Sequence, residues 1–325
     1  MLRRIIFCVS LAGVTTAAFA SFEMMLLPQS TGRVLRYDPV NQVSLGSFQS
    51  LPTAAGMVTI DPTTSTAFSA SSTAVRSTNY DNGIHNWFAS AGVRAIAFDT
   101  FGGVNLFALS SNAVTRFNSQ GNNVSGVSLP TSATWDSMAM SGQYLNIFGR
   151  DSSNNVKAIQ VNTLTNTATS VFDFGRVALP GTTIGGMATF ISPQNGFHYS
   201  VAAFINASGN IEILRALKSV QDWSTTPIFG SQTISTGFSN AVVPAATPSH
   251  DGFYLVGHDS TTSTTLRFRQ FNSIGSFTAV NEFTLAAFGA AGVPFFQVAN
   301  IVAPEPGSML AVGLGALMLL RRRSR

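Results

Sequence analysis

The sequence predicts an all-β protein, and three observations support this fold class. First, apolar segments of four to six residues alternate along the chain with polar turns, many of which carry glycine. Second, only 10% of the residues are charged, whereas an average globular domain has about 25%. Third, the hydrophobic content of 45% is enough to build a core, which excludes a disordered chain.

The apolar segments occur in pairs that are typical of β-hairpins. Two of the connecting turns contain Asn-Gly or Asp-Gly, at residues 195–196 and 251–252, which suit the positive φ angles of tight hairpins. The pairs are 57–60 with 67–70, 94–98 with 104–109, 137–140 with 144–148, 187–191 with 197–201, and 241–246 with 253–256.

A second hairpin follows the first in most units. Segments 34–38, 114–118 and 268–272 are similar to one another, and the last two continue as Asn-Ser-x-Gly. The units begin near residues 57, 94, 137, 187 and 241, a spacing of 37 to 54 residues. Four short strands in roughly 40–50 residues are typical of one blade of a β-propeller.

The two ends of the body complete the set of blades. The five units leave over three N-terminal strands, 23–27, 34–37 and 43–48, and one C-terminal strand, 295–302. Together these form a sixth four-stranded blade that closes the ring and leaves the chain without long open edges. We therefore expect a six-bladed β-propeller over residues 21–302. Seven blades, a pair of β-sandwiches and an irregular solenoid are the alternatives.

One departure from this pattern is expected. Residues 215–223 combine Leu, Ala, Lys, Arg and Gln, which are good helix formers. The sequence therefore predicts a helical turn inserted in the fourth unit.

Residues 1–20 have the three parts of a secretory signal peptide: two arginines, an apolar stretch, and a small-residue cleavage site at Ala18 and Ala20. Cleavage there leaves Ser21 as the first residue of the mature chain. The single cysteine, Cys8, lies in this peptide, so the mature protein has no disulfide and no thiolate site.

Residues 303–325 combine three features in a fixed order. Pro304, Glu305 and Pro306 form an extended segment, because each proline disfavours a helix. The apolar stretch 308–320 follows; as a helix it is about 20 Å long, so flanking residues must help it to cross a bilayer core of about 30 Å. The arginines that end the chain mark the cytoplasmic side of a membrane. They are Arg321, Arg322, Arg323 and Arg325.

This order of motif, helix and arginines resembles the PEP-CTERM sorting signal of Gram-negative bacteria that make exopolysaccharide. The resemblance covers residues 303–325 only. It implies that the exported precursor is held in the inner membrane by the C-terminal helix until an exosortase, a membrane-embedded protease, cuts near the motif. With the Sec export machinery as the first partner, the mature form is expected at the cell surface or in the extracellular matrix. A plain C-terminal anchor is the alternative.

The net charge of +4 belongs to these terminal segments and not to the body. Of the 18 Lys and Arg residues, six lie in residues 1–20 and 303–325, which leaves 12. Of the 14 Asp and Glu residues, only Glu305 lies there, which leaves 13. The body is therefore nearly neutral, and we expect no nucleic-acid partner.

The body carries no familiar catalytic or metal-binding motif. Glycine-rich phosphate loops, Gly-x-Ser-x-Gly, His-Glu-x-x-His and calcium loops are all absent from the sequence, so neither a cofactor nor a metal is expected. Aspartates near hairpin turns or blade junctions are the candidate catalytic carboxylates, and the alternative is that they cap turns. These are Asp61, Asp99, Asp136, Asp173 and Asp251.

Aromatic residues in segments rich in Asn, Ser and Thr are the best candidates for ligand contact. Rings stack on the apolar faces of sugars, while amides and hydroxyls bind the sugar hydroxyl groups. Tyr80, Trp87 and Trp135 are the candidate contacts, and Phe88 and Trp223 have similar surroundings. Packing inside a blade is the alternative for each tryptophan.

Two functions of different classes follow from these observations. The favoured one is a non-catalytic structural or carbohydrate-binding propeller at the cell surface or in the exopolysaccharide matrix, with exopolysaccharide as a candidate partner. The alternative is a secreted propeller hydrolase or lactonase that acts on polysaccharide. That alternative requires a cluster of carboxylates at one mouth of the central channel.

Overall fold

The computed structural model describes residues 21–304 apart from short gaps. The gaps are residues 30, 51–55, 62–65, 72–73, 80–84, 90–91, 100–104, 119, 235–236, 241, 250–251, 260–264, 273–278 and 286–298, and the side chains of 21–23, 85–89 and 299–304 are also outside the described part. Within the part of the chain that the structure describes, no helix is long and apolar enough to cross a membrane. The signal peptide expected at 1–20 and the helix expected at 308–320 lie outside the described residues.

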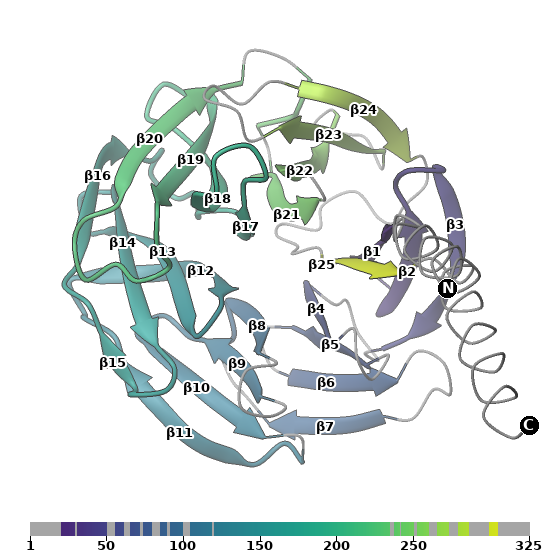
Figure 1. Ribbon diagram of the computed structural model, residues 1–325, viewed down its shortest axis with the longest axis horizontal. Coiled ribbons are helices and arrows are strands. Elements are labelled where there is room, and N and C mark those ends of the chain that lie inside the picture. The colour runs from purple at the N-terminus through teal and green to yellow at the C-terminus, as the bar shows by residue number, and fades with distance from the viewer. Residues whose placement is uncertain are drawn as a thin grey trace, which may run out of the picture.

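The described residues form 25 strands in six antiparallel sheets, which lie as blades around a common centre (Figure 1). The closing blade contains β25 (Ala299–Pro304), β1 (Ser21–Pro28), β2 (Arg33–Asp38) and β3 (Val43–Gln49). The next two contain β4 (Met57–Asp61), β5 (Thr66–Ala70), β6 (Ala74–Asn79) and β7 (His85–Ala89), then β8 (Ala95–Asp99), β9 (Asn105–Leu109), β10 (Ala113–Asn118) and β11 (Asn123–Ser128).

The other three blades complete the ring. One contains β12 (Ala133–Ser141), β13 (Tyr144–Asp151), β14 (Asn155–Asn162), β15 (Thr167–Ala168) and β16 (Phe172–Val177). The last two contain β17 (Ala188–Ile191), β18 (His198–Ile205), β19 (Ile211–Lys218) and β20 (Ile228–Thr233), then β21 (Ala245–Ser249), β22 (Gly252–His258), β23 (Leu266–Asn272) and β24 (Ala279–Leu285). Five sheets have four strands; in the β12–β16 blade both β15 and β16 pair with β14.

The innermost strands of the six blades form a closed ring. In chain order β4 contacts β8, β8 contacts β12, β12 contacts β17 and β17 contacts β21; β25 then contacts both β21 and β4. This ring confirms the predicted six-bladed propeller. It excludes a pair of β-sandwiches and an irregular solenoid, because neither returns to its first strand. The six sheets of the described residues favour six blades over seven.

The closing blade joins the two ends of the described chain, as the sequence predicted. Strand β25 pairs antiparallel with β1, and the register runs from Leu26↔Ala299 to Ser21↔Pro304. The strand thus continues two residues past the expected domain boundary at residue 302 and includes Pro304. It begins at Ala299, and residues 295–298 of the expected strand lie outside the described residues.

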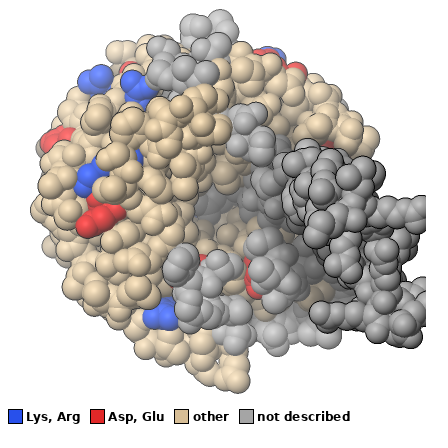
Figure 2. Space-filling view, viewed as in Figure 1, with Lys and Arg blue, Asp and Glu red and all other residues tan. Residues whose placement is uncertain are grey.

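The core lies between neighbouring blades. Successive strand residues point to opposite faces of a sheet, so each blade presents apolar side chains to both of its neighbours. Phe107 and Trp135 are buried together between the β8–β11 and β12–β16 blades, and Phe148 and Trp223 between the β12–β16 and β17–β20 blades. Full burial of a Phe side chain stabilises a fold by about 1.5–3 kcal/mol. On the face drawn in Figure 2, few of the described residues are Lys, Arg, Asp or Glu.

The helical turn expected at residues 215–223 is wrong, since none of these residues is helical. Residues up to Lys218 belong to strand β19, which pairs with β18 on one side and β20 on the other. Helix propensity is a weak preference, and a pleated strand between two partners pairs its backbone on both sides while burying Ala216.

Candidate functional site

The middle of the central channel is uncharged in the part that the structure describes. A cavity of about 160 Å³ lies there, lined by the inner strands of five blades. None of its lining residues is charged; they include Val58, Ile96 and Met138. The described wall of this cavity therefore offers no charged group to a ligand.

A larger pocket lies at the end of the ring where the inner strands begin. Its volume is about 310 Å³. Met57 is the first residue of β4, and Arg94 immediately precedes β8. We call this cavity the mouth pocket; it is lined by Met57, Val93, Arg94, Asp136 and Thr183. It brings together residues of four consecutive blades and contains both a cation and an anion.

A β-bulge places Asp136 at this pocket. Trp135 pairs with Gly149 and Ser137 pairs with Phe148, so Asp136 is an extra residue in β12 without a partner on β13. Bulges re-aim a side chain that would otherwise follow the alternation of the strand. Gly149 permits the close approach, since an added Cβ would lie 2.3 Å from the Thr134 carbonyl oxygen and 2.8 Å from Trp135 Cα.

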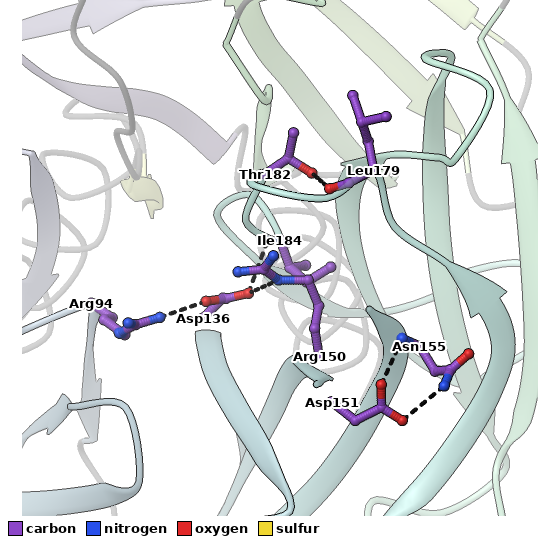
Figure 3. Close-up of polar contacts among 8 residues, drawn as sticks. All are labelled: Arg94, Asp136, Arg150, Asp151, Asn155, Leu179, Thr182 and Ile184. Atoms are coloured by element: carbon purple, nitrogen blue, oxygen red, sulfur yellow. Dashed lines mark hydrogen bonds and ion pairs between the residues drawn. The ribbon is translucent and has the colours of Figure 1, made fainter. Parts of the chain in front are cut away.

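The carboxylate of Asp136 is held from three sides (Figure 3). Arg94 Nη1 donates to Oδ1 at 2.7 Å, and Arg150 Nε donates to Oδ2 at 2.8 Å. The backbone N–H of Ile184 also donates to Oδ2, at 3.2 Å. The arginines lie on opposite sides of the carboxylate, and the three donors come from three consecutive blades.

The loop before β17 brings the third donor into position. The chain forms a turn from Leu179 to Thr182. The backbone N–H and the hydroxyl of Thr182 both donate to the Leu179 carbonyl, at 3.2 and 2.7 Å. The next two residues are Thr183, which lines the mouth pocket, and Ile184, whose N–H reaches Asp136. Figure 3 shows this turn beside the carboxylate.

The three charged groups differ in their access to solvent. The Asp136 side chain is 1% exposed and Arg150 is 14% exposed, whereas Arg94 is 37% exposed. Asp136 and Arg150 therefore form a largely buried ion pair, and Arg94 is the charged residue of the three that a dissolved molecule can reach. The arrangement can bind an anion or a hydrogen-bond acceptor through the exposed part of the Arg94 guanidinium.

A second cluster of three charges lies on the same blade. Lys157 Nζ is 2.5 Å from Asp173 Oδ2 and 3.3 Å from Asp151 Oδ2. The Asp173 hydrogen bond raises the pKa of Lys157 and in return lowers the pKa of Asp173. Burial raises the pKa of Asp151, but hydrogen bonds from Asn155, Ser153 and Lys157 outweigh it and leave that pKa below its usual value.

The predicted carboxylates do not all come together at one site. Asp61 and Asp99 are buried at the final residues of β4 and β8, at the opposite end of the ring from Asp136. Asp173 lies on β16, where it accepts the Gly175 N–H at 2.7 Å as a turn cap. Asp251 lies outside the described residues. Among the residues that the structure describes, no three His, Cys, Asp or Glu side chains are close enough to hold a metal ion.

The structure corrects the predicted role of Trp135. Its side chain has no exposed surface, and its indole N–H donates to the Pro130 carbonyl at 3.1 Å, so it offers nothing to a ligand. Trp223 is likewise buried, against Phe148, Phe172 and Phe229. The sequence around each reads as a polar loop, but Trp135 belongs to a strand. Tyr80 and the side chains of Trp87 and Phe88 lie outside the described residues.

The predicted processing residues lie almost entirely outside the described chain. Pro304 ends strand β25. The others are Ala18, Ala20, Glu305, Pro306, Arg321, Arg322 and Arg323, all outside the described residues.

Sequence reasoning missed Arg94 and Arg150 as partners of Asp136. Arg94 is 42 residues from Asp136, and this separation has meaning only once the blade order is known. Arg150 could have been found. In the hairpin around Ser141 and Gly142, counting pairs back from Ser141↔Tyr144 brings residue 136 beside residues 149 and 150.

No protein-family model matches the sequence, and no curated protein matches it. Solved structures are similar in fold. A chain of a nidogen/laminin complex has a TM-score of 0.57 at 10% identity, over 86% of this chain and 98% of that chain. The WD40 repeats of RRP9 have a TM-score of 0.56 at 11% identity, over 82% and 78%. A chain of the Kuenenia stuttgartiensis hydrazine synthase has a TM-score of 0.53 at 9% identity, over 74% and 71%.

At these identities the likeness extends to the β-propeller fold alone. The three proteins differ in kind, and a propeller supports unrelated activities. The function must therefore be argued from the ends of the domain and from the mouth pocket.

Proposed function

We propose that the protein is an exported, non-catalytic β-propeller that binds carbohydrate or builds structure at the cell surface or in an exopolysaccharide matrix. The proposed partners are the Sec machinery, an exosortase-type protease and the exopolysaccharide itself. The observation that carries the proposal is the register Ser21↔Pro304 between the two strands that close the ring.

This register supports removal of both terminal segments without damage to the domain. The expected mature chain begins at Ser21, which is also the first residue of β1. The PEP-CTERM-like motif begins at Pro304, the last residue of β25. Cuts before Ser21 and after Pro304 leave all 25 described strands in place, and both cuts fall beside the same pair of strands.

The sorting part is tested in an exopolysaccharide-producing Gram-negative host that has an exosortase. We compare the full chain with a Glu305→Ala/Pro306→Ala double variant, which leaves Pro304 and its pairing with Ser21 intact. The wild type should yield a mature form that has lost the C-terminal segment, and the double variant should stay in the membrane fraction at higher mass. Gly307→Ala is the control. Equal masses and locations for wild type and double variant would overturn the sorting proposal.

The binding part is tested by co-sedimentation of residues 21–304 with the host's exopolysaccharide, and reducing ends are assayed in the same tubes. We expect the protein in the pellet with no new reducing ends. Reducing ends that increase with time would overturn the non-catalytic proposal, and protein that stays in the supernatant would overturn matrix binding.

A further inference from the structure

We propose that the mouth pocket binds the carboxylate of an acidic sugar residue, with Arg94 as the side chain that contacts it. The inference rests on the proposed function in the matrix and names the substrate class of that function. It is argued from the charge balance of the pocket, the fixed orientation of Arg94 and the character of the pocket walls.

The charge balance favours an anion. Around Asp136 the described residues place two guanidinium groups on one carboxylate, which leaves one positive charge in excess. Arg150 and the Ile184 N–H already offset the charge of Asp136 from its buried side. The exposed side of Arg94 therefore faces the pocket as a net cation, in a body whose total charge is close to zero.

Arg94 is fixed in orientation before any ligand arrives. Its Nη1 donates a hydrogen bond to Asp136, and that carboxylate accepts two further hydrogen bonds, from Arg150 and from the Ile184 N–H. Its backbone N–H donates to the Leu109 carbonyl at 2.8 Å. A guanidinium has five N–H donors in a planar fork that matches the two oxygens of a carboxylate. Because the side chain is already ordered, binding loses little conformational entropy.

The pocket also suits a sugar ring. Its volume of about 310 Å³ is at the small end of the usual range for ligand sites, about 300–1,000 Å³. Met57 and Val93 supply apolar wall, and Thr183 supplies a hydroxyl-bearing residue. Apolar wall suits the C–H face of a sugar, and the arginine suits its carboxylate.

The test is calorimetric titration of residues 21–304, which contain every described strand, with tri-galacturonate. Maltotriose serves as the neutral probe, and a sulfated trisaccharide as an anion of different geometry. We expect tri-galacturonate to bind and maltotriose to bind at least about tenfold more weakly, since a hydrogen-bonded charge pair contributes a factor of this size. Equal affinity for the neutral and acidic trisaccharides would overturn the proposal, as would preference for the sulfated one.

Variants assign the binding to this pocket. Arg94→Ala should weaken tri-galacturonate binding by about tenfold or more, and Arg94→Lys should restore only part of it, because an ammonium lacks the planar fork. The control is Arg176→Ala, which removes a 49% exposed arginine on β16, outside the pocket. Should Arg94→Ala fail to fold, Thr183→Phe fills the pocket while leaving the charges intact, and it should abolish binding. Unchanged affinity in Arg94→Lys and Thr183→Phe overturns the inference.

The outcomes separate the site from the proposed function. Co-sedimentation of both wild type and Arg94→Ala with the exopolysaccharide to equal extents leaves matrix binding standing and overturns the Arg94 site. Arg94-dependent binding of tri-galacturonate without sedimentation of the wild type supports the site and overturns matrix binding.

Discussion

The β12–β16 blade carries two three-charge clusters of opposite composition. In one, two arginines surround the carboxylate of Asp136; in the other, two aspartates surround the ammonium of Lys157. In the first cluster the central carboxylate is 1% exposed, and its donors come from three blades. The second cluster is formed within one blade; its central ammonium is 16% exposed, and its aspartates are 20% and 57% exposed. From this difference we expect that burial and contacts across blades, rather than the number of charges, decide how much each cluster stabilises the fold.

The comparison has an energetic meaning. A buried charge that loses its partners is destabilising, because the low dielectric strengthens both its attraction to partners and its penalty when alone. An exposed pair is screened by water and salt, so it contributes little. We therefore expect substitutions in the Asp136 cluster to change the free energy of unfolding far more than matched substitutions in the Lys157 cluster.

The largest effect is expected from Asp136→Asn. The amide keeps the shape of the side chain but leaves two guanidinium groups without a counter-charge, which should lower the free energy of unfolding by about 3 kcal/mol. Urea unfolding of residues 21–304 measures it, with Asp173→Asn as the control. A loss of less than about 1 kcal/mol would put the Asp136 cluster in the class of exposed pairs and break the comparison.

A smaller effect is expected from Gly149→Ala. The added Cβ meets the Thr134 carbonyl oxygen and Trp135 Cα, both backbone atoms of the bulge, so the bulge must shift. Overpacking of this kind costs about 1–3 kcal/mol. The matched control is Gly230→Ala on β20, where the added Cβ meets only the flexible side chain of Arg215. Equal unfolding free energies for the two variants would contradict the account of the bulge.

Lys157→Ala is expected to change stability by only about 0.5 kcal/mol. Without the ammonium, Asp173 still accepts the Gly175 N–H, and Asp151 still accepts from the N–H groups of Ser153 and Asn155. Urea unfolding in low and high salt measures this small loss. A loss as large as that of Asp136→Asn would show that exposure does not separate the two clusters.

The smallest effect is the pH dependence that the Lys157 cluster contributes to stability. The folded chain lowers the pKa of Asp173, so this carboxylate stabilises the fold fully above its unfolded value of about 3.9 and less as the pH falls through the lower folded pKa. The raised pKa of Lys157 stabilises the fold fully below about 10.4 and less as the pH rises through the folded pKa.

The gap in unfolding free energy between the wild type and Lys157→Ala should therefore be widest between about pH 4 and pH 10. It should narrow toward either extreme. Unfolding curves of both proteins at a series of pH values measure the gap, and a constant gap at all pH values would contradict this pairing.

Much of the fold could be predicted from the sequence, because a propeller repeats one local pattern. Each hairpin was visible as two apolar segments and a turn, and the leftover segments at the two ends predicted the closing blade that β25 and β1 form. Trp135 was misread because the bulge at Asp136 breaks the strand alternation, so its neighbours look like a polar loop. Residues 215–223 were misread because local propensity favours a helix. Pairing with β18 and β20 makes the first four residues strand, and the last five form no helix.

The mouth pocket could not be predicted in the same way. Its members come from four blades, and which side chains meet at the ring depends on the register of each hairpin and on one extra residue in β12. Repeats predict the number of blades, but the chemistry at the mouth depends on positions where the repeat is broken.

The most direct test of the central claim is a crystal structure of residues 21–304 with bound tri-galacturonate. The account predicts one sugar ring in the mouth pocket, with its carboxylate within hydrogen-bond distance of the Arg94 guanidinium and the Arg94–Asp136 bond still in place. A trisaccharide bound elsewhere on the propeller, with Arg94 in contact with solvent alone, would contradict it.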